Sequence, residues 1–191
     1  MQRNIFYVTS NSGKFQEVES YLKRHCPEIN LLRADIDIEE IQSADLHFVA
    51  IDKAAKAWAH LKVPLLIDDA GIYFNRWNQF PGVLTKFVSL GIGMEGIKRL
   101  IDNGDTGYFQ LWLVYADENG VLQPFEGRCD GQLTNNYKGS AHEGFPFDVC
   151  FVPDGLEKTY AEIKQDPAYE NYLYRIRAVQ AFLEWFNHVS R

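Results

Sequence analysis

The chain has 191 residues, of which 46% are hydrophobic, and a formal net charge of −7 at pH 7. This length and composition predict one globular domain over residues 1–191, or one domain with a small lobe, and they exclude intrinsic disorder. An acidic balance without a run of Lys or Arg excludes the charge pattern of proteins that wrap a nucleic acid duplex, so we expect no nucleic acid polymer as a partner. The composition does not exclude that a local cluster of cations binds a small anion.

Cysteine usage and hydropathy point to the cytoplasm. Cys26, Cys129 and Cys150 are odd in number and widely spaced, so they predict neither a disulfide framework nor a zinc ribbon. The N-terminus contains no signal-peptide core, and the sequence contains no run of about 18 apolar residues, which is the length that could cross a membrane. We therefore expect a soluble cytoplasmic protein without a membrane partner.

The first part of the chain predicts strands that alternate with helices. Buried strands are indicated by short apolar runs, and helices by apolar residues that recur every three or four positions. These patterns predict, in chain order, a strand at 5–8, a helix from 14 to 25, a strand at 29–38, a helix at 44–61 and a strand at 64–67. The last of these strands is closed by the polar segment 68–71.

The rest of the chain adds a hairpin, because Asn-Gly at 119–120 lies between two apolar runs. Crossover helices together with hairpins predict an α/β protein with a mixed parallel and antiparallel sheet and flanking helices. The expected elements are a short strand at 72–74, a turn at 77–82, two helical pieces ending near 103, hairpin strands at 107–116 and 121–128, a polar loop at 135–143, a strand at 147–152 and a helix at 171–189.

The loop Thr9-Ser10-Asn11-Ser12-Gly13-Lys14 follows the first predicted strand and opens a helix. At such a place backbone N–H groups and a lysine can converge on phosphate. The loop is not a Walker A motif, because that motif has Gly where this chain has Val8 and Ser or Thr where it has Phe15. The alternative interpretation is a polar loop whose Ser and Asn cap the helix.

Two groups of carboxylates follow predicted strands, Asp68-Asp69 and Glu39-Glu40. Neighbouring strand residues point to opposite faces, so one of the two aspartates is expected to face a given site. Carboxylates from two strand ends are typical of a Mg²⁺ site, where substrate phosphates and water complete the coordination. Alternatively, an aspartate caps a turn and the glutamates are solvated.

Three further motifs are ambiguous taken alone. Lys53 and Lys56 lie on one face of the second predicted helix, where they could be solvated cations. The segment 91–96 matches GxGxxG literally but lacks the βαβ frame of a dinucleotide site. The segment 144–148, Gly-Phe-Pro-Phe-Asp, is more typical of core packing than of base stacking.

Taken together, these motifs resemble the inosine triphosphate pyrophosphatase family over nearly the whole chain. The family's T-x-N-x-x-K opening is matched by Thr9, Asn11 and Lys14, followed by Glu17. Its other motifs are matched in order by Glu40, Lys53, the run Asp68-Asp69-Ala70, the turn Pro81-Gly82 and the segment 144–148. Two departures occur: of the family segment K-N-x-x-S-H-R, aligned with residues 169–175, only Arg175 is kept, and Pro146 replaces the second glycine of G-F-G.

The resemblance implies two lobes around a central cleft and Mg²⁺-dependent hydrolysis of non-canonical purine nucleoside triphosphates, such as ITP, dITP and XTP, to the monophosphate and pyrophosphate. It implies a homodimer, a nucleoside triphosphate as substrate and Asp69 as the catalytic base. Metal ligands by resemblance are Glu40, Asp69 and Asp68. Substrate-binding residues by resemblance are Thr9, Ser10, Asn11, Ser12, Gly13, Lys14, Lys53, Ala70, Phe145, Phe147, Asp148 and Arg175.

Two alternatives stay open beside this function. One is a related pyrophosphohydrolase with a different base preference, and the other is a nucleotide-binding protein without turnover. In the base pocket implied by the resemblance, Leu173 and Tyr174 stand where the family has Ser and His. Arg175 is the donor that remains, and it can pair with a 6-keto oxygen but not with a 6-amino group.

Overall fold

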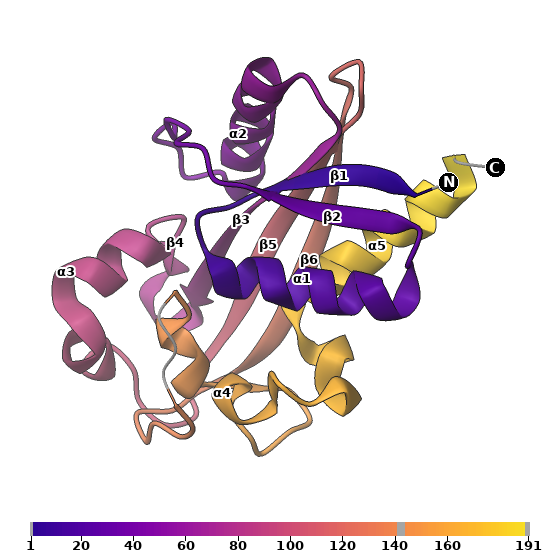
Figure 1. The fold of residues 1–191 in the computed structure, drawn as a ribbon. Helices are drawn as coiled ribbons and strands as arrows, with labels where there is room; N and C mark the ends of the chain where they lie inside the picture. The colour runs from indigo at the N-terminus through magenta and orange to yellow at the C-terminus, as the bar shows by residue number, and fades with distance from the viewer. Residues whose placement is uncertain (1, 141–143, 190–191) are drawn as a thin grey trace. The chain divides into compact units, whose positions relative to one another are not determined.

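The computed structural model of the chain describes residues 2–140 and 144–189 (Figure 1). Strands and helices alternate at first, and short 3₁₀ helices, labelled η, follow later in the chain. The elements are β1 (Arg3–Val8), α1 (Ser12–His25), β2 (Ile29–Ala34), α2 (Leu46–Leu61), β3 (Leu65–Phe74), η1 (Asn75–Trp77), β4 (Phe80–Gly82), α3 (Thr85–Lys98), β5 (Thr106–Ala116), β6 (Leu122–Leu133), η2 (Pro146–Val149), β7 (Phe151–Pro153), α4 (Tyr160–Ile163), η3 (Pro167–Tyr172) and α5 (Tyr174–Val189).

The strands of the described residues form one seven-stranded sheet in the order β2-β1-β3-β5-β6-β7, with β4 paired to β3. β1 is parallel to β2, with Val8 opposite Ala34, and parallel to β3, with Val8 opposite Ile67. The pairs β3–β4 and β6–β7 are antiparallel. The predicted mixed sheet with flanking helices is therefore confirmed.

The chain contacts divide into two compact units, each made of several segments. The first unit comprises the described residues within Met1–Asp69, Leu111–Gly127 and Arg175–Arg191. The second comprises those within Ala70–Gln110 and Arg128–Tyr174, and β3, β5 and β6 contribute residues to both units. The predicted single domain over 1–191 stays a prediction.

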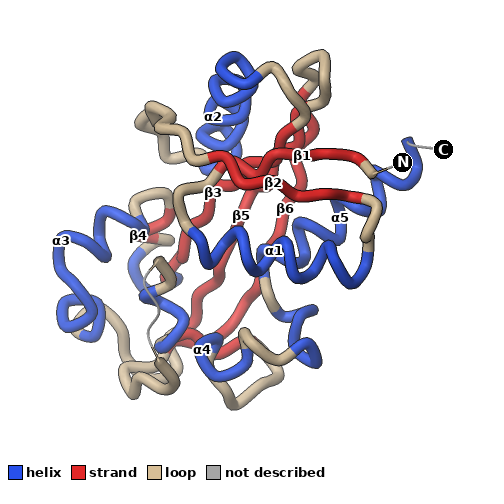
Figure 2. Tube along the Cα trace, in the orientation of Figure 1, coloured by secondary structure: helices blue, strands red, loops and turns tan. Residues whose placement is uncertain are grey.

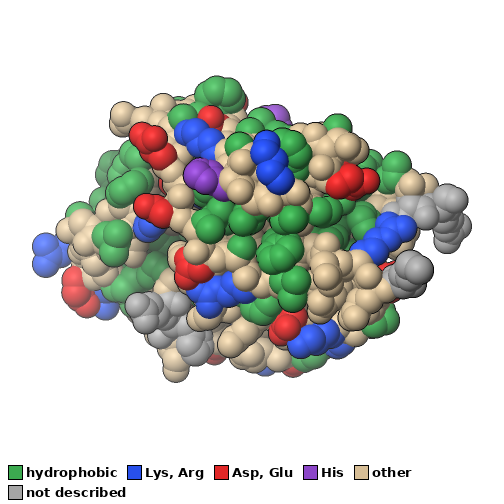
Figure 3. Space-filling model, turned by 45° about the horizontal axis from the view of Figure 1, so that its top comes forward, with side chains coloured by type: hydrophobic (Ala, Val, Ile, Leu, Met, Phe, Trp, Pro, Cys, Tyr) green, Lys and Arg blue, Asp and Glu red, His purple; other side chains and the backbone are tan. Residues whose placement is uncertain are grey.

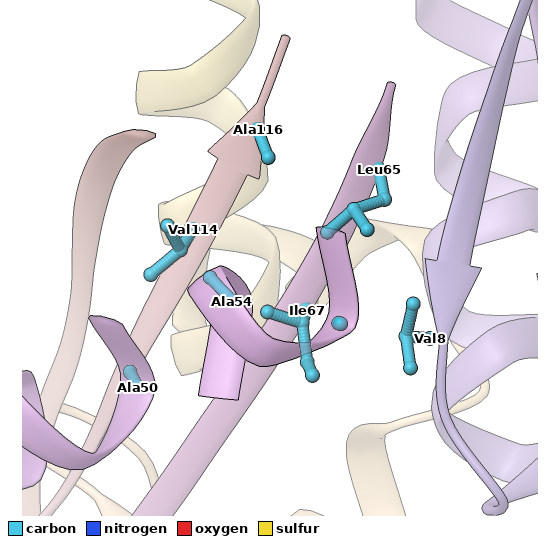
Figure 4. Close-up of a cluster of buried hydrophobic side chains, with 8 residues drawn as sticks. Val8, Ala50, Ala54, Leu65, Ile67, Val114 and Ala116 are labelled. Carbon is cyan, nitrogen blue, oxygen red and sulfur yellow. The ribbon is translucent and has the colours of Figure 1, made fainter. Parts of the chain in front are cut away.

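In the first unit, helix α2 packs on one face of the strands and α1 and α5 on the other. Figure 2 shows α1 and α2 on opposite sides of β1 and β2. Three alanines of α2, at positions 50, 54 and 57, belong to a buried cluster with Leu65 and Ile67 of β3 (Figure 4). On the other face, Tyr115 of β5 contacts Phe182 of α5, with ring centroids 5.5 Å apart. Alternation along the strands thus separates two cores.

Strand β3 differs most from its prediction, because it continues through 68–71 to Phe74 instead of closing there. β1 ends opposite Ile67, so Asp68 and Asp69 do follow the end of the parallel pairing although β3 itself continues. The prediction confused the end of this pairing with the end of the strand. After Ile67, β3 acquires a new partner in β4, which begins to pair at Ile72.

Two other strand predictions were too long. β2 ends at Ala34, and Ile36 and Ile38 beyond it pack in part against the α2 core, which explains the alternation that extended the prediction to 38. The strand expected at 147–152 is η2 followed by the short β7. Pro146 at the start of η2 favours a helical turn, and the N–H of Asp148 donates to the carbonyl oxygen of Phe145 at 3.2 Å.

The remaining helices agree with the predictions in part. α3 is two helical pieces, as predicted, that meet at Gly93, where φ is 61° and ψ is −176°. α5 begins at Tyr174 rather than 171, because Leu173 is extended and separates it from η3. α4 was missed, although the capping box of Thr159 and Glu162 marks its start.

The hairpin of β5 and β6 is confirmed, and its turn contains Gly120 at φ 81°. Part of the predicted polar loop, 141–143, lies outside the described residues. None of the helices among the described residues combines the length and apolar character that crossing a membrane requires.

The two glycines Gly131 and Gly91 should respond oppositely to alanine. A Cβ on Gly131 would lie 2.3 Å from the carbonyl oxygen of Val152, whereas a Cβ on Gly91 would meet nothing within 4 Å. We expect Gly131→Ala to lower the free energy of unfolding by about 1–3 kcal/mol, and Gly91→Ala to leave it unchanged or raise it by up to about 1 kcal/mol. Urea unfolding of both variants measures this, and equal behaviour would contradict the close β6–β7 approach.

Candidate active site

Most of the predicted site residues fall in the first unit, around the end of β1. On the face drawn in Figure 3, Lys and Arg side chains are scattered among acidic and apolar ones. Charges lie closer together inside the first unit, where Lys14, Lys53, Asp68 and Asp69 are linked by ion pairs of 3.0 and 3.8 Å. This cluster is the candidate active site.

The loop 9–14 is shaped by hydrogen bonds to its own backbone. Asn11 is the N-cap of α1, and its Oδ1 accepts from the N–H of Gly13 at 2.9 Å and of Lys14 at 3.2 Å. Arg33 of β2 donates from Nε to the carbonyl oxygen of Thr9 at 3.0 Å and from Nη2 to that of Ser10. The capping interpretation therefore holds for Asn11. These same bonds fix the start of α1, from which Lys14 extends.

Asp68 is enclosed by donors from three other elements. Its Oδ1 accepts from the hydroxyl of Tyr7 at 2.5 Å, and its Oδ2 lies 3.0 Å from Nζ of Lys14 and 3.4 Å from Nη2 of Arg175. The side chain is 1% exposed. Burial alone would raise the pKa of Asp68, but Lys14, Arg175 and the Tyr7 hydroxyl outweigh it and hold the pKa well below its usual range. Asp68 is thus ionised at neutral pH.

Asp69 points to the opposite face of β3, as alternation predicts, and lies beside α2. Its Oδ2 is 3.8 Å from Nζ of Lys53, and the same Nζ donates to Oε1 of Glu40 at 2.9 Å. Burial raises the pKa of Asp69 against the opposing effect of Lys53. Burial lowers the pKa of Lys53, but Asp69 and Glu40 outweigh it and the net shift is upward. The Asp69 side chain is 21% exposed, so it can be reached from solvent.

The basic partners of Asp68 are not equivalent. Lys14 is 21% exposed at its side chain, and burial lowers its pKa even though Asp68 raises it. Arg175 is 1% exposed, and its Nη1 lies 2.9 Å from Oε2 of Glu17. The guanidinium was expected to recognise a base, and that assignment stays a prediction. Its burial between two carboxylates indicates a different role.

Metal-binding residues were predicted at Glu40, Asp69 and Asp68. Across residues 2–140 and 144–189, no group of three or more His, Cys, Asp or Glu side chains forms a ready metal cage. Mg²⁺ does not need one, since it is commonly bound by one or two carboxylates together with phosphates and water. Glu40 and Asp69 share Lys53 and are both partly exposed, whereas both oxygens of Asp68 contact other donors.

The remaining predicted residues belong to the second unit. Phe147 is 2% exposed and packs edge-to-face on Phe74, which is the core-packing interpretation. Asp148 is buried and pairs with Nζ of Lys164 at 2.9 Å. The same Nζ lies 3.1 Å from the ring centroid of Phe145. Ala70 follows Asp69 within β3.

Sequence reasoning missed Tyr7, Arg33 and Lys164, although each contacts a predicted residue. Of these, Tyr7 carried a detectable signal, because a tyrosine in a buried apolar strand needs a partner for its hydroxyl. Arg33 and Lys164 lie in no recognisable motif.

Comparisons with known proteins agree with the fold and the motifs. A family model described as the Ham1 family matches residues 5–185. The chain belongs to the Ham1 family. It is 35% identical over 187 residues to a protein from Pyrococcus horikoshii named dITP/XTP pyrophosphatase, with 95% of each chain covered. It is 33% identical over 165 residues to inosine triphosphate pyrophosphatase 2 of Trypanosoma cruzi, covering 85% of this chain and 82% of that one.

Solved Ham1 structures share the fold. The Staphylococcus aureus Ham1 protein matches with a TM-score of 0.77 at 20% identity, over 99% of this chain and 100% of that one. A HAM1 protein from Coxiella burnetii matches with a TM-score of 0.76 at 24% identity, over 98% and 100% of the two chains. The resemblance stated from the motifs is confirmed by the family model and by the relatives named above.

Asp68→Asn should destabilise the protein strongly, because it leaves Lys14 and Arg175 beside a neutral amide in a buried place. We expect a loss of about 3–5 kcal/mol in the free energy of unfolding at pH 7. The folded pKa of Asp68 lies below the unfolded value, so its contribution is present above about pH 4 and is lost on acidification. The difference between wild type and variant should therefore shrink as the pH falls.

Urea unfolding between pH 3 and pH 7 measures this effect. Asp35→Asn is the matched control, since Asp35 pairs with Arg33 at 3.2 Å while 61% exposed and should contribute at most about 1 kcal/mol. Similar losses in the two variants would contradict the central place given to Asp68.

Proposed function

We propose that the chain is a Mg²⁺-dependent nucleoside triphosphate pyrophosphohydrolase that acts on non-canonical purine nucleotides of the ITP, dITP and XTP type. The observation that carries this proposal is the pair of lysines beside the two neighbouring carboxylates of β3, Lys14 with Asp68 and Lys53 with Asp69. The names of the curated relatives support the same reaction class. The products are the nucleoside monophosphate and pyrophosphate.

Asp69 is the general base in this proposal. It faces the side of β3 that carries Lys53 and Glu40, it is accessible, and its raised pKa is closer to the value that proton acceptance from water requires. Asp68 is unsuited to the role, because donors contact both of its oxygens and its pKa is held low. The sequence leaves open which of the two aspartates is the general base, and these differences in exposure and pKa favour Asp69.

Lys14 and Lys53 bind phosphate oxygens in the proposal, together with the loop from Thr9 to Gly13. An ammonium group has three N–H donors, and the contact of Lys14 with Asp68 uses one of them. Phosphoryl transfer depends mainly on positioning and on stabilisation of charge, which cations on fixed elements can supply. Lysines on α1 and α2 would act from the two faces of β3.

Glu40 and Asp69 are the proposed ligands of Mg²⁺. Their oxygens are hard donors, they are already gathered around one cation, the ammonium of Lys53, and both are partly exposed. A bound Mg²⁺ would supply charge stabilisation to the phosphates and to the leaving pyrophosphate. Asp68, also named from the sequence, fits this role less well because its oxygens serve Tyr7 and Lys14.

One observation favours an alternative base preference for this enzyme. Leu173 and Tyr174, which occupy the family's Ser and His positions, are both 6% exposed, and Tyr174 stacks on Phe109 at 4.6 Å. Side chains packed in a core offer a nucleotide base fewer hydrogen bonds than the family's Ser and His would. A related pyrophosphohydrolase with a broader or different base preference is therefore the second candidate. Phe145, Phe147 and Asp148 stay predicted substrate-binding residues.

The deciding experiment for the function is a pyrophosphate-release assay over a panel of triphosphates. We expect ITP, dITP and XTP to be hydrolysed with Mg²⁺, activity to disappear with a chelator, and ATP to be a poorer substrate by a modest factor. Preference for ATP or a pyrimidine triphosphate would favour the second candidate. Binding without any pyrophosphate release would instead identify a nucleotide-binding protein.

Asp69→Asn should lower kcat by at least about 100-fold, because the amide is nearly isosteric but cannot accept a proton. Steady-state kinetics with ITP and circular dichroism measure the loss and the fold. Asp52→Asn is the control: Asp52 pairs with Lys56 on α2, one turn from the site lysine, at 2.7 Å. Activity close to wild type in Asp69→Asn would move the base to another residue.

A homodimer and a cytoplasmic location stay predictions. The segment from η1 through α3 carries the kind of surface that association requires, large apolar side chains exposed by 40% or more. They are Trp77, Phe80, Leu84, Phe87, Leu90 and Ile92.

A further inference from the structure

We propose that Arg175 is a positioning residue for the phosphate-binding lysine, Lys14, and that it acts through Asp68. The proposal rests on the proposed function, because it assigns a role within the same phosphate site. It replaces the expectation that Arg175 recognises the base.

Asp68 is the partner that Lys14 and Arg175 share. Nζ of Lys14 lies 3.0 Å and Nη2 of Arg175 lies 3.4 Å from the same oxygen, Oδ2. The hydroxyl of Tyr7 donates to the other oxygen, Oδ1, at 2.5 Å. Contacts at both oxygens define the orientation of the carboxylate, and the carboxylate in turn defines where the ammonium of Lys14 lies.

Arg175 is fixed at its other nitrogen by Glu17, with Nη1 and Oε2 2.9 Å apart. Glu17 lies three residues after Lys14 on α1, so both side chains project from one face of that helix. A guanidinium is planar, and two contacts at different nitrogens fix its rotation. Arg175 therefore ties the lysine-bearing face of α1 to Asp68 on β3.

The burial of Arg175 agrees with positioning rather than with substrate contact. Its side chain is 1% exposed, as is that of Asp68, and Glu17 is 9% exposed, whereas Lys14 reaches 21%. Among these four charged side chains, Lys14 is the one most open to a ligand. A cation held in place before substrate arrives stabilises phosphate charge without reorganising.

Arg175→Met should lower kcat/KM by about 10- to 100-fold through displacement of Lys14. The factor should be the same for ITP and ATP, because the triphosphate is common to both, and KM should rise more than kcat falls. An arginine that recognises a 6-keto group would instead affect ITP far more than ATP. Measuring kcat and KM separately for both substrates distinguishes the two roles.

A double-mutant cycle with Lys14→Met tests whether Arg175 acts through the lysine. If it does, adding Arg175→Met to Lys14→Met should lower kcat/KM by less than about 3-fold, since the lysine to be positioned is already absent. Fully additive losses, or a loss confined to ITP, would overturn the proposal. Arg175→Lys should recover part of the lost kcat/KM, because it keeps a cation beside Asp68.

Two further variants serve as control and substitute. Arg177→Met removes a partly exposed arginine from the same helix and should leave kcat/KM unchanged. Tyr7→Phe removes the hydrogen bond to Asp68 but no charge, and should lower kcat/KM by about 2- to 10-fold for both substrates. If circular dichroism finds a variant at Arg175 unfolded, Tyr7→Phe takes its place in the cycle, and additivity with Lys14→Met then refutes the proposal.

The two proposals fail in different ways. A wild-type protein that releases no pyrophosphate from any triphosphate refutes the proposed function. An active wild type whose Arg175 or Tyr7 variants change base preference, or add fully to Lys14→Met, refutes the positioning role alone.

Discussion

The alternation of side chains along β3, at the point where β1 stops beside it, determines the candidate active site. Two adjacent aspartates would repel each other if they shared a face, but a strand directs them to opposite sides. Asp68 is directed into the core beneath α1 and α5, and Asp69 toward α2. Each therefore meets its own lysine, and one carboxylate becomes a structural anchor while the other stays accessible for chemistry.

Burial increases the energetic importance of the ion pairs around the two aspartates. Ions taken out of water are costly unless they are paired, and a buried pair broken on one side is strongly destabilising. Around Asp68 the opposite charges are balanced: Lys14 and Arg175 face Asp68 and Glu17. These four charged side chains therefore contribute through the orientation they give one another rather than through a net charge. The Asp69 side, with Lys53 between two carboxylates, retains an acidic excess that suits a divalent cation.

Local patterns predicted much of the fold, and long-range contacts explain what they missed. The helices at the start of the chain, the parallel strands and the Asn-Gly hairpin follow from periodicity and turn chemistry, which act within a few residues. β3 was cut short because a strand that changes partner looks like a strand that ends. The role of Arg175 could not be derived, because its partners Asp68 and Glu17 lie 107 and 158 residues away in the sequence.

The alanines of α2 have a consequence beyond filling the core. Positions 50, 54 and 57 are fully or almost fully buried against β3, and their small side chains allow the helix backbone to approach the strand closely. The separation of packed elements depends on the side chains between them. Lys53 is carried by this helix, so the size of its apolar neighbours sets how far the ammonium is from Asp69. Apolar packing beneath α2 thus determines the distance between two charged groups. Substitutions of these alanines would change the separation of Lys53 and Asp69 without contacting a nucleotide.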